Sequence, residues 1–131
     1  MRILIVDDDY VSRIKLKELM AKYGDCDAAG DGELAIKMVE SAFREGIPYK
    51  LITMDIEMPG MSGQEALNKI RQLEKSSKIL PNKEAKILMV TGKEDIKNVS
   101  KSYGGGCDGY CTKPFTDKSI EKTLKEIGVI T

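Results

Sequence analysis

Polar residues that could do chemistry stand directly after apolar runs at four places in this chain. They are Asp7, Asp8 and Asp9 after residues 3–6, Asp55 and then Glu57 after residues 51–54, Thr91 after residues 87–90, and Thr112 and then Lys113 after residues 109–111. A carboxylate is costly to bury without a partner, so an acid that ends an apolar run needs a reason. Either it caps the element that follows, or it is held at a site for chemistry.

If Asp7, Asp8 and Asp55 lie close together, their charges must be compensated. Two carboxylates ~4 Å apart repel by roughly 4 kcal/mol at an effective dielectric constant of about 20. Such a cluster binds protons or a cation, and oxygen ligands without nitrogen or sulfur favour Mg²⁺. Lys113 would add positive charge, which makes a pocket for a phosphoryl group. Asp55 is the best-placed nucleophile, giving an aspartyl phosphate, and Thr91 offers a hydroxyl donor.

Each of these residues also has a simpler interpretation. Asp8 or Asp9 could cap the first helix, and Asp55 could cap the turn after its strand. Lys113, which precedes Pro114, could be a solvated loop residue. Complementary chemistry at four separate strand ends nevertheless favours a site over four unrelated roles.

The absence of histidine removes several kinds of catalysis. The chain has no histidine, so Ser-His-Asp and Cys-His catalysis and histidine-ligated metals are excluded, and it cannot carry a phosphohistidine. Its three cysteines, Cys26, Cys107 and Cys111, are too few and too scattered for a zinc site without histidine. Reduced thiols are the expected state.

Size and charge bound the class of protein. With 131 residues the chain is long enough for one domain with a real core, and we expect residues 1–131 to be that single domain, with no output domain attached. Lysines plus arginines equal aspartates plus glutamates at 21 each, which argues against nucleic-acid or membrane-surface binding. The chain shows neither a membrane-spanning stretch nor a signal-peptide pattern, so we predict a cytoplasmic protein.

Five short apolar segments alternate with helical patterns. The predicted strands cover residues 3–6, 26–29, 51–54, 87–90 and 109–111, and the first, third and fourth are nearly continuous apolar runs, as in strands covered on both faces. This alternation predicts an α/β domain with a doubly wound, five-stranded parallel sheet. In such a sheet ligands bind beyond the carboxyl ends of the strands, where the polar residues above stand.

Apolar spacing and capping residues predict the helices between these strands. The first helix should end at Gly24, and the second should begin at Asp31-Gly32. The third should begin with a capping box of Ser62 and Glu65. The fourth should cover about 94–103, before the glycines at 104–106, and the fifth should begin near Thr116. Their expected buried positions are Leu16, Leu19, Met20 and Tyr23; Ala35, Val39 and Ala42; Ala66, Ile70 and Leu73; and Ile120, Leu124 and Ile127. Residues 75–84, with Pro81, read as a loose polar connection.

With these residues in place, the chain resembles a response-regulator receiver domain of the CheY-like family over essentially its whole length. The resemblance rests on ILIVDDD, LITMDIEMPGMSG, ILMVTG and GYCTKPF, in the family's order and spacing. It implies a flavodoxin-like (βα)5 fold with strand order 2-1-3-4-5. It also implies a role for each residue of the candidate site.

Asp55 would be the phosphoacceptor, and Asp8, Asp55 and the backbone carbonyl of Glu57 would ligate Mg²⁺, with Asp7 acting on the metal largely through water. Lys113 would contact the phosphoryl oxygens, and Thr91 would rotate to hydrogen-bond them. Tyr110 would be an aromatic switch that moves inward with Thr91, although a simple half-buried strand aromatic is the alternative. The family also leads us to expect a cis peptide between Lys113 and Pro114.

The resemblance implies a phosphoacceptor switch rather than an enzyme. A sensor histidine kinase or a histidine phosphotransfer protein would supply the phosphoryl group. A downstream effector would read a face formed by residues 93–127, which is rich in lysine; a solvated helical face is the alternative interpretation. We expect a monomer, with dimerisation on phosphorylation left open.

Three other functions compete with this interpretation. The chain could be a phosphorelay intermediate or phosphate sink that exchanges phosphoryl groups with a histidine phosphotransfer protein. It could be a haloacid-dehalogenase-type phosphatase, but those enzymes place Asp-x-Asp after their first strand, whereas Asp55-x-Glu57 follows the third. It could be a pseudo-receiver used only for interaction, and the full set of Asp8, Asp55, Thr91 and Lys113 argues against that.

Overall fold

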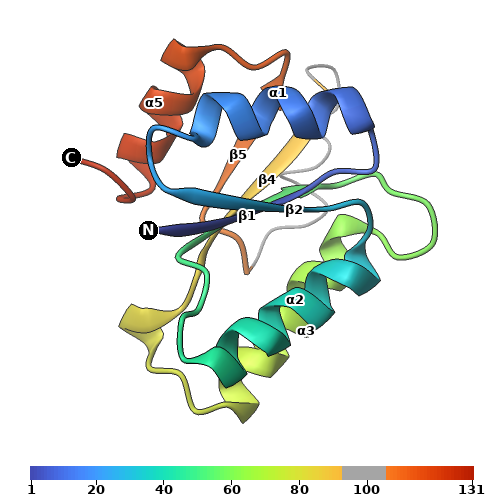
Figure 1. The fold of residues 1–131 in the computed structure, drawn as a ribbon, viewed down its shortest axis with the longest axis vertical. Helices are drawn as coiled ribbons and strands as arrows, with labels where there is room; N and C mark the ends of the chain where they lie inside the picture. Colours follow the sequence, from blue (N-terminus) through green and yellow to red (C-terminus); the bar gives the residue numbers. More distant parts are fainter. Residues whose placement is uncertain (93–105) are drawn as a thin grey trace.

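A single parallel sheet organises the molecule. The computed structural model describes residues 1–92 and 106–131, and within these residues five strands pair in the order β2-β1-β3-β4-β5 (Figure 1). The strands are β1 (Arg2–Val6), β2 (Asp25–Ala29), β3 (Leu51–Asp55), β4 (Lys86–Gly92) and β5 (Gly109–Lys113). The predicted doubly wound α/β fold and its strand order are confirmed. Every predicted strand exists, and all five are longer at one or both ends than their apolar residues alone suggested.

Helices cover both faces of the sheet. The described helices are α1 (Tyr10–Met20), α2 (Gly32–Glu45), α3 (Gly63–Ser76) and α5 (Asp117–Glu126), with a short 3₁₀ turn η1 (Pro81–Lys83). Figure 1 shows α1 and α5 on one face and α2 and α3 on the other. This is the arrangement that right-handed crossovers produce in a parallel sheet.

Side-chain caps fix where these helices begin. Asp9, Asp31, Ser62 and Thr116 are the N-caps of α1, α2, α3 and α5, and each side chain accepts a hydrogen bond from a backbone N–H in the first turn. Asp9, rather than Asp8, therefore caps α1, which leaves Asp8 available to the site.

The structure corrects one predicted helix end and one predicted capping box. The first helix ends at Met20, before Gly24, whose expected role as a helix stop is wrong. Gly24 instead packs against the chain start, where an added Cβ would lie 2.0 Å from the carbonyl oxygen of Met1. At α3, Ser62 caps the Glu65 N–H at 3.2 Å as predicted, but its hydroxyl also donates to the Glu65 carboxylate at 3.4 Å, so the box is formed on one side.

Residues 75–84 are more ordered than a loose connection. The first two belong to the last turn of α3, and Pro81–Lys83 form η1. A hydrogen bond from the Ile79 N–H to the Glu74 carbonyl at 2.9 Å ties the turn after the helix back to it. The predicted helix over 94–103 and glycines 104 and 105 lie outside the described residues, as do Lys93, Lys97, Lys101 and Tyr103 of the expected effector face.

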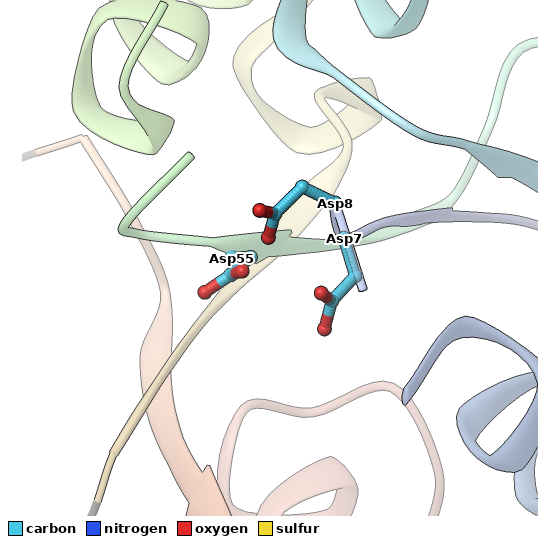
Figure 2. A group of neighbouring side chains, drawn as sticks. All are labelled: Asp7, Asp8 and Asp55. Atoms are coloured by element: carbon cyan, nitrogen blue, oxygen red, sulfur yellow. The ribbon is translucent and has the colours of Figure 1, made fainter. Parts of the chain in front are cut away.

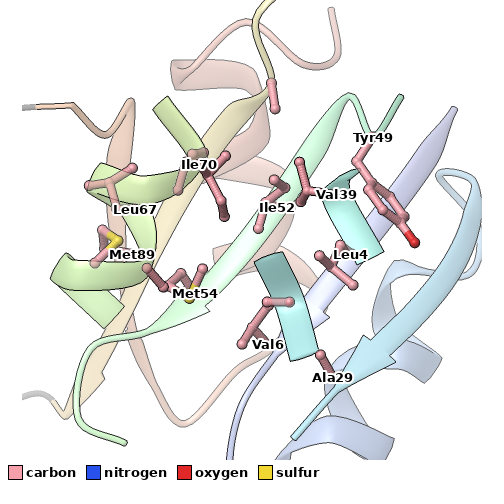
Figure 3. Packing of buried hydrophobic residues seen from close by; sticks show 14 of the residues in the cluster. Leu4, Val6, Ala29, Val39, Tyr49, Ile52, Met54, Leu67, Ile70 and Met89 are labelled. Carbon is pink, nitrogen blue, oxygen red and sulfur yellow. The ribbon is translucent and has the colours of Figure 1, made fainter. Parts of the chain in front are cut away.

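Two apolar clusters form the core, one on each face of the sheet. One lies between the sheet and helices α2 and α3, and Figure 3 shows Leu4, Ile52 and Met54 of the strands meeting Val39 and Ile70 of these helices. The other lies under α1 and α5. Of the predicted helix positions, Leu19, Tyr23, Leu73 and Ile127 are only partly buried against these clusters, and the other nine are buried. No helix in the described parts of the chain is both long and apolar enough to cross a membrane.

The central strand β3 buries one polar group that is unpaired among the described residues. Thr53 is fully buried, and its hydroxyl has no hydrogen-bond partner there. Replacing it with valine, which has nearly the same shape, is expected to raise the free energy of unfolding by about 1 kcal/mol because the desolvation penalty disappears. Urea unfolding measures this. Thr123→Val is the control, since the Thr123 hydroxyl donates to the Ser119 carbonyl at 2.8 Å, and no gain for Thr53→Val would contradict the prediction.

Candidate functional site

The carboxyl ends of four neighbouring strands bring the candidate residues to one edge of the sheet. Asp7 and Asp8 follow β1, Asp55 ends β3, and Thr91 lies near the end of β4. Lys113 ends β5 and pairs in register with Gly92 of β4. The predicted convergence of polar residues at this edge is therefore confirmed for the described residues.

Three carboxylates form the centre of the site. Asp7, Asp8 and Asp55 each offer a carboxylate oxygen, and these oxygens lie within 4.8 Å of one another (Figure 2). Asp7 and Asp55 are buried, at 2% and 7% exposed, whereas Asp8 is exposed to solvent. The cluster is thus open on one side, where a ligand can approach.

Lys113 supplies the opposite charge. Its ammonium nitrogen lies 3.0 Å from Oδ2 of Asp7 and 3.9 Å from Oδ2 of Asp55. Burial lowers the pKa of Lys113, but the hydrogen bond to Asp7 and the charge of Asp55 outweigh burial and raise it. The lysine is therefore an ion-paired member of the site, and its interpretation as a solvated loop residue is wrong. The peptide bond between Lys113 and Pro114 is cis, as the family resemblance implied.

The turn after β1 holds Asp7 in a fixed orientation. Its carboxylate Oδ1 accepts a hydrogen bond from the backbone N–H of Asp9 at 2.9 Å. Its backbone carbonyl accepts one from the Arg13 guanidinium at 2.8 Å. Sequence reasoning missed Arg13, because nothing in the local pattern shows that a helical arginine turns back onto the strand end.

The turn after β3 depends on the glycine that begins α3. The N–H of Gly63 donates to the Ile56 carbonyl at 2.9 Å, and an added Cβ would lie 2.2 Å from the backbone oxygen of Asp55. A side chain at position 63 would therefore push on the backbone of Asp55 itself. The sequence marks this residue only as one glycine of a turn.

Asp55 is electrostatically perturbed. Burial, and then the nearby charge of Asp7, raise the pKa of Asp55 to about 7, with Lys113 acting in the opposite direction. Its carboxylate is therefore destabilised in the absence of a further cation, which is what a site for a cation and a transferred group requires.

This perturbation makes a pH-dependent prediction for protein kept in a chelator. An aspartate with a raised folded-state pKa binds more protons in the folded than in the unfolded state, so its contribution to stability falls as pH rises from about 4 to about 7. Asp55→Asn should therefore stabilise the fold at about pH 8 by about 2 kcal/mol, after allowance for solvent screening, and much less at about pH 5. Thermal unfolding at the two pH values measures the difference.

The control for this prediction is Glu18→Gln, a neutralisation of an exposed acid on α1. It should change stability little at either pH. A gain for Asp55→Asn that is the same at both pH values would show that charge at Asp55 is not the cause.

The donor set fits a hard divalent cation. Three carboxylate oxygens within 4.8 Å, two from buried residues and one from an exposed residue, match the preference of Mg²⁺ for oxygen ligands and for sites that retain water. The exposed Glu57 lies two residues after Asp55, and the role of its backbone carbonyl as a ligand stays a prediction.

Thr91 and Tyr110 lie on one face of two neighbouring strands. In the register of β4 and β5, Thr91 pairs with Thr112 and Met89 with Tyr110, so Tyr110 is the diagonal neighbour of Thr91. Thr91 is buried and Tyr110 is half-buried. Burial, and then a hydrogen bond with Cys107, raise the pKa of Tyr110 to about 12, so the phenol stays protonated.

Comparison with known proteins identifies the family. The family model for the response regulator receiver domain matches residues 3–125. The chemotaxis protein CheY of Pseudomonas aeruginosa is 32% identical over 129 residues, which are 97% of this chain and 95% of that protein. The hybrid signal transduction histidine kinase G of Dictyostelium discoideum is 32% identical over 133 residues, but these are 100% of this chain and only 4% of the kinase.

A solved structure agrees in both fold and sequence. The response regulator protein TrrA of Thermotoga maritima, in complex with Mg²⁺-BeF, superimposes with a TM-score of 0.70 and is 34% identical, with 96% of this chain and 97% of that chain covered. The family-model match over residues 3–125 includes residues of all five strands and the Asp7, Asp8 and Asp55 cluster. The chain therefore belongs to the family of response regulator receiver domains.

Proposed function

We propose that this chain accepts a phosphoryl group on Asp55 and thereby switches a protein-binding surface. The observation that carries the proposal is the position of Asp55, a nearly buried carboxylate held between two acids and the ammonium group of Lys113. The donor would be the phosphohistidine of a sensor histidine kinase or of a histidine phosphotransfer protein. The chain acts as a phosphoacceptor and not as an enzyme on a separate substrate.

In the proposed transfer, a carboxylate oxygen of Asp55 forms a bond to phosphorus while the bond from phosphorus to the donor imidazole nitrogen breaks. The electron pair of that bond stays on the imidazole. Lys113 stabilises the negative charge on the phosphoryl oxygens, and the Thr91 hydroxyl donates to one of them. Asp7, Asp8, Asp55 and the Glu57 carbonyl would hold Mg²⁺, which when bound neutralises charge on the phosphoryl oxygens. The solved complex of TrrA with Mg²⁺-BeF supports this assignment.

The proposed output is a change at the Thr91 and Tyr110 pair. When Thr91 turns toward the phosphoryl group, the diagonal neighbour Tyr110 moves inward, which shifts the population of two surface conformations. An effector protein would read this change on the face formed by residues 93–127. Of this face the structure describes β5 and α5, where Lys118, Lys122 and Lys125 are exposed.

One comparison favours a second candidate. Because the chain also matches a hybrid signal transduction histidine kinase, it could act as a phosphorelay intermediate or phosphate sink. A phosphorylated histidine phosphotransfer protein separates the two: rapid transfer in both directions favours the relay, and one-way loading favours the switch. The single-domain organisation and the monomeric state stay predictions.

Acetyl phosphate tests the proposal directly. Incubation with Mg²⁺ should add the mass of one phosphoryl group to the intact protein, without Mg²⁺ the gain should be much smaller, and Asp55→Asn should show none. Asp31→Asn, which alters a helix cap instead, should load like the wild type. A gain in Asp55→Asn equal to that of the wild type would overturn the assignment of Asp55, and absence of both loading and Mg²⁺ binding would favour the pseudo-receiver.

A further inference from the structure

A hollow lies at the edge of the sheet opposite the three aspartates. It has a volume of about 300 Å³ and is formed by residues 48–50, 82–84 and 128–129 together with Met1 and Lys86. These segments stand at the amino ends of β1, β3 and β4, and Figure 1 shows the connection before β3, η1 and the last residues gathered near the N-terminus. We call this the basal hollow.

One wall of the basal hollow is apolar. Pro48, Tyr49 and Val129 contribute to it, and Tyr49 is held from two sides. Its hydroxyl donates to Oδ2 of Asp27 at 2.7 Å, and the Arg2 guanidinium lies 4.6 Å from the centre of its ring. Tyr49 is therefore held in place before a ligand binds, which lowers the entropy cost of binding a ligand against it.

The rest of the basal hollow carries an excess of positive charge. Lys50, Lys83 and Lys86 line it against a single acid, Glu84, although the chain as a whole has no net charge. Lys86 lies 3.8 Å from Oδ1 of Asp108, and among the described residues neither Lys50 nor Lys83 has a carboxylate within 4.0 Å. Their charges are therefore available to a ligand, and the concave shape concentrates their field.

We propose that the basal hollow binds a small organic anion that has an apolar body, with its phosphate or carboxylate at the lysines and its body against Pro48 and Val129. The volume is at the lower end of small-molecule pockets and suits a single ring with one anionic group. The proposal does not depend on phosphorylation of Asp55, because no residue of the three-aspartate cluster lines this hollow.

Nuclear magnetic resonance titration of ¹⁵N-labelled protein tests the proposal with two probes, phenyl phosphate and benzoate. Saturable shifts should appear at residues 49–50, 82–86 and 128–129, with a dissociation constant on the order of 1 mM for a ligand of this size. The stronger of the two probes tells whether the natural ligand is a phosphate or a carboxylate. Benzylamine, which has the ring but the opposite charge, should cause no saturable shift there.

Two variants with equal loss of charge provide the comparison. Lys50→Gln/Lys83→Gln should weaken binding about tenfold, whereas Lys15→Gln/Lys37→Gln, which removes two exposed lysines outside the hollow, should leave it unchanged. Equal weakening of binding in both variants would show that only the net charge of the protein matters, and would overturn the proposal. So would shifts from inorganic phosphate as strong as those from phenyl phosphate, or no saturation with either probe.

Discussion

Lys113→Ala is expected to slow phosphoryl acceptance from acetyl phosphate by at least about a hundredfold at saturating Mg²⁺. Lys113 is the cation that contacts both Asp7 and Asp55 in the described part of the chain, at 3.0 Å and 3.9 Å. Without the Lys113 ammonium group, the negative charge of the incoming phosphoryl oxygens would be repelled by two buried carboxylates and less of that repulsion would be offset. The rate of mass gain of the intact protein measures the effect.

The control is another ion-paired lysine. Lys22, on the surface, lies 3.4 Å from Asp117, so Lys22→Ala removes the same charge and a similar contact away from the site. It should load at the wild-type rate. Lys113→Arg should recover only part of the activity, because a planar guanidinium does not replace a compact ammonium group. Wild-type loading in Lys113→Ala would remove this lysine from the mechanism.

Arg71→Ala is expected to lower the free energy of unfolding by about 4 kcal/mol. Arg71 of α3 donates to the Glu74 carboxylate at 2.7 Å, to the Ala85 carbonyl at 2.9 Å, to the Gly106 carbonyl at 2.8 Å and to the Asp108 carboxylate at 3.1 Å. One side chain thus joins α3 to the starts of β4 and β5. Urea unfolding measures the loss.

Most of that cost comes from the partner that is left behind. Glu74 is 1% exposed, and without Arg71 its charge has no cation partner among residues 1–92 and 106–131, although it still accepts from the Ala85 N–H at 2.7 Å. Arg71→Met/Glu74→Gln should therefore be more stable than Arg71→Ala, because the glutamine keeps that hydrogen bond and carries no charge. If the double variant is less stable than Arg71→Ala, the unpaired charge of Glu74 is not the main cause of the lost stability.

An exposed ion pair gives the comparison for Arg71. Lys125 and Glu121 lie 3.4 Å apart on α5, and both side chains are 51% exposed. Lys125→Ala should change the free energy of unfolding by less than about 1 kcal/mol, because solvent screens this pair. A loss comparable to that of Arg71→Ala would show that burial is not what distinguishes the two pairs.

Local patterns in the sequence were sufficient where short-range physics decides the structure. The apolar runs around Ile5, Ile52 and Leu88 predicted strands buried on both faces. Successive side chains of a strand point to opposite faces of the sheet, so a continuous apolar run is excluded from water only if both faces are covered. Caps at Asp31, Ser62 and Thr116 predicted helix starts, because a side-chain oxygen and a first-turn N–H are three residues apart in any helix. The end of α1 was wrong because Gly24 serves a contact with the chain start, which lies far away in sequence.

The site residues were also predictable as a set, but not their contacts. The alternation of strands and helices predicted a parallel sheet whose carboxyl ends carry Asp7, Asp55 and Lys113, and the family resemblance supplied the strand order. The sequence left open which aspartate would cap α1, and it left Lys113 either in solvent or in the site. The structure decides both, because Asp9 reaches the Ser12 N–H while Lys113 reaches Asp7 across two strands.

The sequence by itself determined the fold, the edge of the sheet that carries the acids, and the residue types of the site, because these depend on periodicity and on the order of strands along the chain. Only the tertiary structure decided the contacts of Arg71 with the residues that precede β4 and β5, the hydrogen bond from Arg13 to Asp7, and the lysine-lined basal hollow. Each of these joins residues distant in sequence, and their distances depend on helix placement and strand register. Helix placement and strand register depend on how the whole chain packs, and no local sequence pattern encodes them.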